Sequence, residues 1–316
     1  MASYQRGAAG HHLKTLLVGG LGFIGKHIIR ALAQHCTLTV LSNAKSALRN
    51  AEFVKTYDLC VEIGDITDGP RVKEVMGRHM PDAVVHLAAL TGIAKCNENP
   101  YSAFSVNVLG TYNVIMGCEE CNSKLIFLSS REVYGDTRSD RTREDDPLIP
   151  NNTYGITKML GERLVVWAAS TYGLDYTILR LTNVYGPEGD QYNVQAIIRK
   201  ALSERRIQIL GGSQLVNPTY VEDVAEVVRR CLIDSRTSRQ TLNVSSKEDM
   251  TVEEMVSRIV SVLDAPINVE RAPMRVGETL VFRPSVEKLE RVLGYCPPTT
   301  FAEGLQKTVS WYRNKK

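Results

Sequence analysis

Two side chains in the middle of the sequence are spaced to exchange a proton with an alcohol. Tyr154 and Lys158 lie four residues apart in Tyr-Gly-Ile-Thr-Lys, so a helix would place the phenol and the ammonium on one face, one turn apart. A phenol titrates near pH ~10 and is a poor base at neutral pH, but a fixed positive charge nearby favours the phenolate. The pair is a candidate acid/base unit, although the same spacing is also typical of ordinary surface helices.

The composition limits what the chain of 316 residues can do. With 43% hydrophobic and 23% charged residues, it fits a soluble globular protein of one large or two smaller domains. A net charge of +3 is too small to predict binding to nucleic acid or membranes. No apolar run approaches the ~20 residues of a membrane-spanning helix. Residues 1–12 are small and polar and are expected to form a loose arm.

Cysteine usage indicates a reducing compartment. The seven cysteines are scattered, and Cys118 and Cys121 form the only CxxC pair. An odd count without clustering is typical of free thiols rather than of disulfides or a metal site. We therefore expect a cytoplasmic protein that binds no metal.

A glycine-rich turn near the N-terminus has the context of a dinucleotide-binding motif. The apolar run 13–18 leads into Gly19-Gly-Leu-Gly22-Phe-Ile-Gly25, and an amphipathic segment follows at 26–34. Strand, turn and helix in this order would direct free N–H groups at a pyrophosphate. Gly19 would permit the turn, Gly22 would admit the phosphates, and Gly25 would let helix and strand pack closely. The predicted contacts of this turn also include Phe23 and Ile24.

The end of the second predicted strand, 37–41, bears on the form of the cofactor. A dinucleotide fold usually places an acidic residue there, which bonds the ribose 2′-hydroxyl. Here the residue is Ser42, followed by Asn43, Lys45 and Arg49. No carboxylate would repel a 2′-phosphate and two cations are near, so the sequence favours NADP over NAD. In the other interpretation, the two cations are solvated charges on a helix.

Strands and helices alternate through the first half of the chain. This spacing indicates a parallel, doubly wound sheet, in which ligands bind beyond the carboxyl ends of the strands. Asp65 is expected to reach the adenine, His86 to be packed inside its strand, and Asn107 to brace the site. Further strands are predicted at 61–63, 83–87 and 125–128, and helices at 71–79 and 101–120. The remaining predicted cofactor contacts are Ile66, Leu87, Ala88 and Ala89.

The second half of the chain is expected to complete the sheet and to add a substrate region. The helix of the Tyr–Lys pair is predicted at 153–172, and a strand at 176–181. We therefore expect an α/β fold, with a Rossmann-type domain over 13–181 whose sheet is completed by segments near 219–246. A smaller C-terminal substrate-binding domain would lie mainly within 182–316.

Taken together, the motifs resemble those of a known family, the extended short-chain dehydrogenases/reductases that modify nucleotide sugars. The resemblance covers almost the whole chain, and the order of the motifs makes it specific. It includes the glycine turn at 19–25, Gly64-Asp65-Ile66, His86-Leu-Ala-Ala89, Asn107-Val-Leu-Gly-Thr111, Ser129-Ser130 with Val-Tyr-Gly135, Tyr154 with Lys158, Asn183-Val-Tyr-Gly-Pro187 and Tyr220-Val-Glu-Asp-Val224.

The resemblance implies a catalytic triad. Tyr154 would remove the proton of the sugar 4-hydroxyl while a hydride passes to the nicotinamide. Lys158 would keep the phenol acidic and hold the nicotinamide ribose. Ser130 would hydrogen-bond the reacting oxygen, unless it is simply a strand-end hydroxyl that caps the backbone.

The resemblance leaves the role of Glu132 open. In the family's 4-epimerases the positions of Arg131 and Glu132 are usually small or neutral. In its 4,6-dehydratases and UDP-xylose synthase-like decarboxylases the second position is Glu, in a Thr-x-Glu pattern, and the dehydratase Glu removes the C5 proton. This chain has Ser130 in place of the Thr. Glu132 is therefore either a base or an ion-pair partner of Arg131 or another cation.

Substrate contacts are implied at Arg131, Asn183, Asn193 and Arg275. A guanidinium at position 275 could bind a diphosphate bidentately, and the other interpretation is a surface cation. Many relatives carry a further phosphate-binding Arg where this chain has Val216, so this chain lacks one of the family's diphosphate-binding arginines.

We thus expect an NAD(P)-dependent nucleoside-diphosphate-sugar 4-epimerase, in which a transient keto sugar is reduced from its other face. The alternative is a 4,6-dehydratase that uses Glu132 as the C5 base. A decarboxylase, a carbonyl reductase and a non-catalytic NAD(P)-sensing protein are less favoured. The resemblance also implies a homodimer formed through the helices at 101–120 and 153–172.

Overall fold

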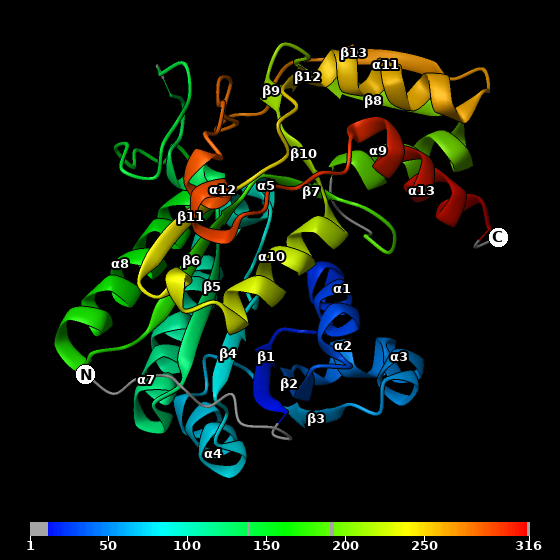
Figure 1. Ribbon diagram of the computed structural model, residues 1–316. Helices are drawn as coiled ribbons and strands as arrows, with labels where there is room; N and C mark the ends of the chain where they lie inside the picture. Colours follow the sequence, from blue (N-terminus) through cyan, green and yellow to red (C-terminus); the bar gives the residue numbers. More distant parts are fainter. Residues whose placement is uncertain (1–11, 138, 190–192, 315–316) are drawn as a thin grey trace.

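Seven parallel strands form the sheet around which the chain is built (Figure 1). They are β1 (Leu13–Val18), β2 (Cys36–Ser42), β3 (Cys60–Ile63), β4 (Ala83–His86), β5 (Lys124–Ser130), β6 (Tyr176–Leu181) and β11 (Gln240–Val244). Their order is β11-β6-β5-β4-β1-β2-β3, which is that of the Rossmann-type, doubly wound fold predicted from the alternation. The computed structural model describes residues 12–137, 139–189 and 193–314, with only the backbone of residue 193.

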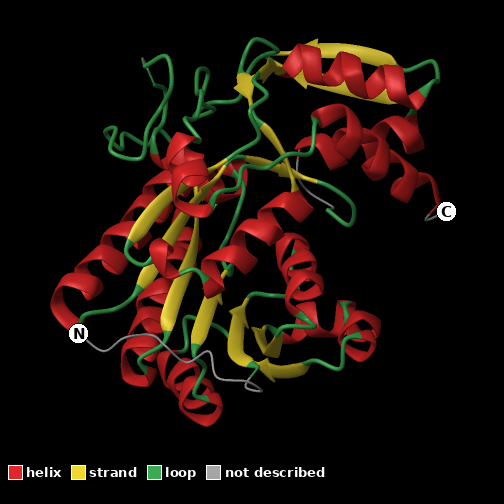
Figure 2. Ribbon diagram, viewed as in Figure 1, coloured by secondary structure: helices red, strands yellow, loops and turns green. Residues whose placement is uncertain are grey.

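Helices cover both faces of the sheet, which explains why its strands are continuous apolar runs. One face packs against α1 (Phe23–Leu32), α10 (Val221–Ile233) and α12 (Glu287–Leu293). The other packs against α4 (Gly69–His79), α7 (Thr111–Cys121) and α8 (Thr153–Tyr172) (Figure 2). Short helices α2 (Ala44–Arg49) and α3 (Ala51–Thr56) follow β2, and α5 (Ile93–Glu98) and α6 (Pro100–Phe104) follow β4.

A second, smaller layer has its own hydrophobic core (upper right in Figure 1). Its elements are α9 (Asn193–Glu204), α11 (Val252–Leu263), α13 (Phe301–Asn314) and the parallel pair β8 (Arg206–Leu210) and β13 (Asn268–Ala272). Two short strand pairs accompany it: β7 (Asn183–Tyr185) with β10 (Pro218–Tyr220), and β9 (Leu215–Val216) with β12 (Met250–Thr251). Single 3-10 turns occur at η2 (Arg131–Val133) and η3 (Ser235–Thr237).

The helix that bears the Tyr–Lys pair has the bounds expected from the sequence. It starts after Asn152, whose side chain accepts a hydrogen bond from the backbone N–H of Gly155, and ends at Gly173 in the left-handed conformation.

The prediction of one continuous helix at 101–120 is wrong, because the segment is divided into three helical elements. A π-helical turn, η1 (Ser105–Gly110), separates α6 from α7, and at this turn the amide of Asn107 bonds to residues outside the helix.

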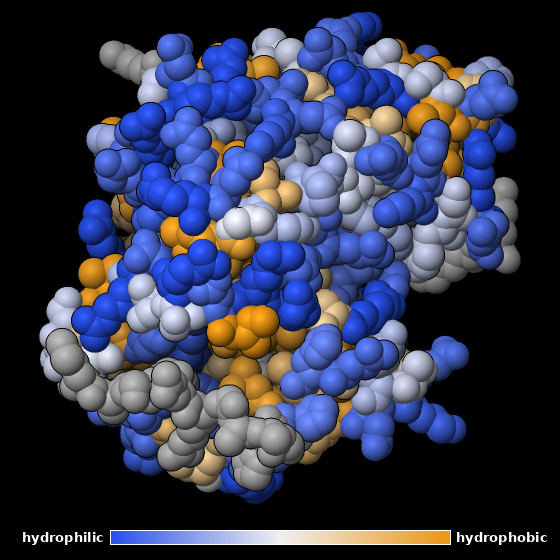
Figure 3. All heavy atoms as spheres, in the orientation of Figure 1, coloured by the Kyte–Doolittle hydropathy of each residue, from blue (hydrophilic) through white to orange (hydrophobic). Residues whose placement is uncertain are grey.

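The outer surface is mostly hydrophilic on the face shown in Figure 3, where hydrophobic residues form separate groups. None of the helices in the described part of the chain is both long and apolar enough to cross a membrane.

Candidate active site

The glycine turn brings the start of α1 close to the ends of β1 and β4. Gly19 has φ +82°, and a β-carbon there would lie 2.7 Å from the backbone of Ala88. A β-carbon on Gly25 would lie 2.2 Å from the carbonyl oxygen of Gly20, so the helix can approach the turn only without a side chain. At Gly22 the nearest atom would be 3.5 Å away. The turn therefore leaves room at the N-terminus of α1, as the phosphate-binding interpretation requires.

A cavity of about 470 Å³ lies at the carboxyl ends of the strands, between the sheet and the smaller layer. Its wall includes residues from the glycine turn, from the ends of β4, β5 and β6, from α8 and from the smaller layer. The predicted site residues in this wall are Gly19, Gly22, Phe23, Ile24, Gly25, Leu87, Ala89, Ser130, Arg131, Glu132, Tyr154, Lys158, Asn183 and Arg275. The structure thus gathers most of the predicted site around one space.

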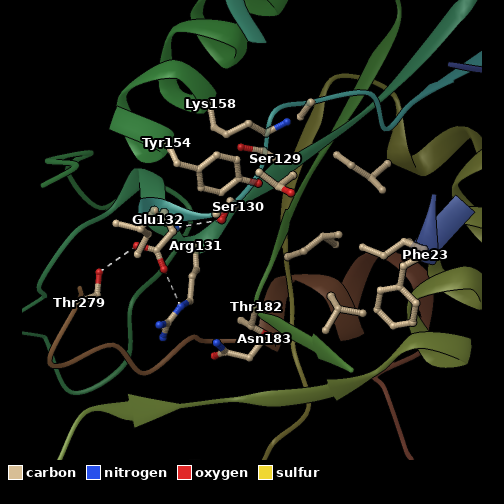
Figure 4. Close-up of a pocket in the computed structure, with 18 of the residues that line it drawn as sticks. Phe23, Ser129, Ser130, Arg131, Glu132, Tyr154, Lys158, Thr182, Asn183 and Thr279 are labelled. Carbon is tan, nitrogen blue, oxygen red and sulfur yellow. Dashed lines mark hydrogen bonds and ion pairs between the residues drawn. The ribbon is translucent and has the colours of Figure 1, made fainter. Parts of the chain in front are cut away.

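The candidate catalytic residues come from two elements that meet at this cavity (Figure 4). Tyr154 and Lys158 project from the first two turns of α8, and Ser130 ends β5. The Oγ of Ser130 accepts a hydrogen bond from the backbone N–H of Glu132 at 3.2 Å, so it caps the η2 turn and also faces the cavity. Both interpretations of this serine are therefore compatible with its position.

Lys158 is a buried ammonium group. Its Nζ lies 4.3 Å from the centre of the Phe127 ring, a distance at which a cation is attracted to an aromatic face. Burial lowers the pKa of Lys158 to about 8, and the negative charge of Glu162, one turn further along α8, partly opposes this. The ammonium thus stays charged at neutral pH but loses its proton more readily than an exposed lysine.

A buried polar network supports α8 beneath the cavity. Glu162 accepts hydrogen bonds from the Oγ of Ser129 at 2.5 Å and from Arg180, whose Nη2 lies 2.7 Å from its Oε2. Arg180 also donates to the Tyr134 hydroxyl, which in turn donates to Asn243 on β11. This network joins α8 to three strands of the sheet, so it fixes the helix against the strand ends.

The carboxylate of Glu132 is engaged on both oxygens. Its Oε1 accepts from the Nε of Arg131 at 3.1 Å, which makes the ion pair that the sequence left as one of two alternatives. Its Oε2 accepts from the Nδ2 of Asn152 at 3.0 Å and from the hydroxyl of Thr279 at 3.2 Å. Arg131 also donates to the carbonyl of Leu215. Glu132 lines the cavity, but its acceptor atoms already have protein partners.

The residues expected to bind the sugar diphosphate differ in environment. The Oδ1 of Asn183 accepts from the backbone N–H of Asn217 at 3.1 Å. The side chain of Arg275 is 53% exposed, and its Nη1 lies 3.6 Å from the Oε1 of Glu278. The side chain of Asn193 lies outside the described residues.

Sequence reasoning did not select several residues that line the cavity, including Thr91, Lys95, Gln214 and Thr279. They lie in irregular segments or at the start of short helices. Since neither a motif nor a periodic pattern marks them, only the three-dimensional arrangement identifies them.

The other predicted cofactor contacts lie outside the cavity wall. Ser42 is buried at the end of β2, Asn43 caps α2, and Lys45 is exposed on that helix. Asp65 is exposed and accepts hydrogen bonds from Thr67. Ile66 is packed beneath Gly110, and Ala88 contacts the glycine turn through its backbone.

Asn107 does not face the cavity. It is 1% exposed, its Oδ1 accepts from the backbone N–H of Leu90, and its Nδ2 donates to the Leu90 carbonyl and the Thr157 hydroxyl. Asn107 is thus corrected from a predicted cofactor contact to a residue that braces the loop after β4 against α8. His86 is packed as predicted, bonded to Thr111, and its burial lowers its pKa to about 3.

Comparison with known proteins decides the family. Residues 15–245 match the model of the NAD dependent epimerase/dehydratase family. The chain belongs to this family.

Members of the epimerase/dehydratase family with different names resemble the chain to a similar degree. A Mycobacterium tuberculosis protein named dTDP-glucose 4,6-dehydratase is 30% identical over 315 residues, 96% of this chain and 94% of that protein. A Halalkalibacterium halodurans protein named UDP-glucose 4-epimerase is 29% identical over 307 residues, 90% of this chain and 91% of that protein. The Thermus thermophilus UDP-glucose 4-epimerase complex with NAD has a TM-score of 0.87 and 26% identity, covering 96% of this chain and all of the other.

Proposed function

We propose that the protein is a nucleoside-diphosphate-sugar 4-epimerase that transiently oxidises the sugar at C4. The observation that supports this most directly is the convergence of Tyr154, Lys158 and Ser130 on a cavity bordered by the glycine turn. The open side of Gly22 at the start of α1 fits the phosphates of a dinucleotide,. A nicotinamide dinucleotide bound there would supply the acceptor and donor of hydride.

The protein residues would handle the proton and the developing charge. Tyr154 takes the proton of the 4-hydroxyl and later returns it, while Ser130 hydrogen-bonds the same oxygen. The buried ammonium of Lys158 favours the phenolate because it is a positive charge in a poorly solvated site,. Acid/base positioning of this kind is worth about 10²–10⁴ in rate. Inversion then requires the keto sugar to present its other face before reduction.

The pairing of Glu132 favours epimerisation over dehydration. A base that removes the C5 proton must direct a carboxylate oxygen at the substrate, whereas both oxygens of Glu132 accept hydrogen bonds from protein groups, namely Arg131, Asn152 and Thr279. The 4,6-dehydratase remains the second candidate because Glu132 lies in the cavity wall, two residues after Ser130. The resemblance to a protein named dTDP-glucose 4,6-dehydratase also supports that candidate.

For the substrate, we propose that Arg131 contacts the sugar and that Asn183, Asn193 and Arg275 contact the nucleoside diphosphate.

For the cofactor, we propose NADP. Ser42 provides no carboxylate at the end of β2, and Lys45 and Arg49 are both exposed on the following helix. Mass spectrometry of the dinucleotide released from purified protein tests this preference, and NAD as the main species would refute it.

The function is tested with a panel of UDP- and dTDP-hexoses, whose products are followed by proton NMR with NAD or NADP added. Inversion at C4 with C6 unchanged is expected. Loss of the C6 hydroxyl would instead support the dehydratase. Tyr154→Phe is the matched control: it keeps the ring and lacks the proton-transferring hydroxyl, so turnover should fall by about 10²-fold or more while the dinucleotide still binds.

A further inference from the structure

Residues 275–281, here called the strap, run from the smaller layer across to the Rossmann-type domain. At one end the backbone N–H groups of Leu280 and Val281 both donate to the Oδ1 of Asp136, at 2.6 and 3.1 Å. At the other end Arg275 and Glu278 line the cavity. The strap thus connects a cavity-lining cation to the segment that follows β5.

In its middle the strap lies against the beginning of α8. Gly277 has φ +82°, and a β-carbon there would lie 3.2 Å from the Cβ of Asn152. The carbonyl of Gly277 accepts from the Nδ2 of Asn152 at 3.0 Å. Asn152 also caps α8, because its Oδ1 accepts from the backbone N–H of Gly155 at 2.8 Å. The strap therefore contacts the residue that sets where the catalytic helix begins.

Glu132 connects the strap to the beginning of α8. Its Oε2 accepts from Thr279 of the strap (Figure 4) and from Asn152 of the helix cap, so one oxygen atom bridges them. The backbone of Glu132 also contacts the helix, since a β-carbon on Gly155 would lie 2.2 Å from the Glu132 carbonyl oxygen. Glu132 and Thr279 are 7% and 3% exposed, which protects these bonds from competition by water.

We propose that Glu132 is a positioning residue: its carboxylate holds the strap in register with α8 and so fixes Arg275 relative to Tyr154. The ligand affected is the diphosphate of a nucleoside diphosphate, and this step rests on the proposed function for the contact with Arg275. Arg131 completes the arrangement, because its ion pair with the Oε1 of Glu132 leaves the other oxygen to the strap and the cap. In this role the carboxylate acts on binding through Arg275 and accepts no proton from the sugar.

The test uses the affinity of cofactor-saturated protein for UDP and dTDP, measured by calorimetry, which does not depend on turnover. Glu132→Gln supplies one acceptor oxygen in place of two, and Thr279→Val removes the strap hydroxyl without changing its shape. Each should raise Kd about tenfold, the effect of losing one hydrogen bond to a charged group. Thr177→Val is the matched control, because this buried hydroxyl bonds the Thr237 carbonyl outside the cavity, and it should leave Kd unchanged.

A double-mutant cycle identifies the route. In an Arg275→Ala background, Glu132→Gln and Thr279→Val should cause no further loss of nucleotide affinity. Additive losses, or wild-type affinity in both single variants, would overturn the proposal, and so would a wild-type protein that binds neither nucleotide. A fall in kcat of about 10²–10⁴ for Glu132→Gln with unchanged Kd would make Glu132 a proton-transfer group instead. The epimerase proposal is tested separately: if it is wrong, the NMR products of the wild-type protein will show no inversion at C4, whatever the nucleotide affinities are.

Discussion

The ammonium of Lys158 lies 4.3 Å from the centre of the Phe127 ring, inside the wall of the cavity that Tyr154 also lines. In the part of the chain that the structure describes, no carboxylate lies within ion-pair distance of this nitrogen. Burial lowers the pKa of this ammonium to about 8, and this has consequences for both activity and stability.

Activity should fall as the pH rises through the pKa of Lys158, about 8. Below that pH the ammonium is charged and favours the Tyr154 phenolate, and above it the charge is lost. The pH profile of kcat/KM should show an alkaline limb near pH 8. In Lys158→Arg this limb should move upward, because a guanidinium stays protonated. An identical limb in both proteins would contradict the assignment.

Burial of the Lys158 ammonium should lower the free energy of unfolding of the cofactor-free protein. Its folded pKa lies below the unfolded value of 10.5, so the unfolded chain binds more protons between about pH 8 and 10.5, and stability rises with pH across that window. Lys158→Met should increase the free energy of unfolding at pH 7 by about 2–3 kcal/mol, as measured by urea denaturation. The gain should shrink near pH 10.

Lys124 is the matched control for that measurement. It is also buried, and burial lowers its pKa, but its Nζ donates to the Cys231 carbonyl at 2.7 Å and to the Thr237 hydroxyl at 2.9 Å. Lys124→Met would leave both acceptors without their donor, which costs about 1–3 kcal/mol. Stabilisation by both substitutions would show that burial of the ammonium alone determines the result, whatever hydrogen bonds the lysine makes.

Features encoded by neighbouring residues were predictable from the sequence. The glycine turn, the strand ends and the bounds of α8 depend on local patterns, and for α8 on a cap at Asn152 and a stop at Gly173. The packed state of His86 followed from its place inside an apolar strand. Each of these depends on a few consecutive residues, which is the range over which sequence patterns are informative.

Features that depend on distant contacts were not predictable. Glu132 and Thr279 are 147 residues apart in the chain, and no periodic pattern marks the strap. The π-helical turn at Ser105–Gly110 interrupts an otherwise helical pattern, and its Asn107 bonds to Leu90 and Thr157 elsewhere in the fold. The sequence could state two roles for Glu132, but only its partners favour one of them.

Breaking the buried pair of Glu162 and Arg180 should strongly destabilise the fold. Their side chains are 4% and 6% exposed, so Glu162→Gln leaves a buried guanidinium without its counter-charge. This should lower the free energy of unfolding by about 3–5 kcal/mol, measured by urea denaturation. Glu120→Gln, which breaks the exposed pair with Lys73, should change stability little. Equal losses in the two variants would show that burial of the Glu162–Arg180 pair does not increase the cost of removing one partner.

The exposed aromatic face of α6–α8 should form a homodimer interface, as the family resemblance implies. Tyr101 is 85%, Leu109 50% and Trp167 40% exposed, and Trp167 stacks with Tyr112 at 6.4 Å between ring centres. Light scattering after gel filtration should give twice the mass of the chain. Trp167→Glu places a charge in this apolar face and should yield a monomer. Ile233→Glu changes a more exposed apolar residue at the end of α10 and should remain dimeric. If the wild-type protein is a monomer at micromolar concentration, this face is exposed to solvent and the predicted dimer interface is wrong.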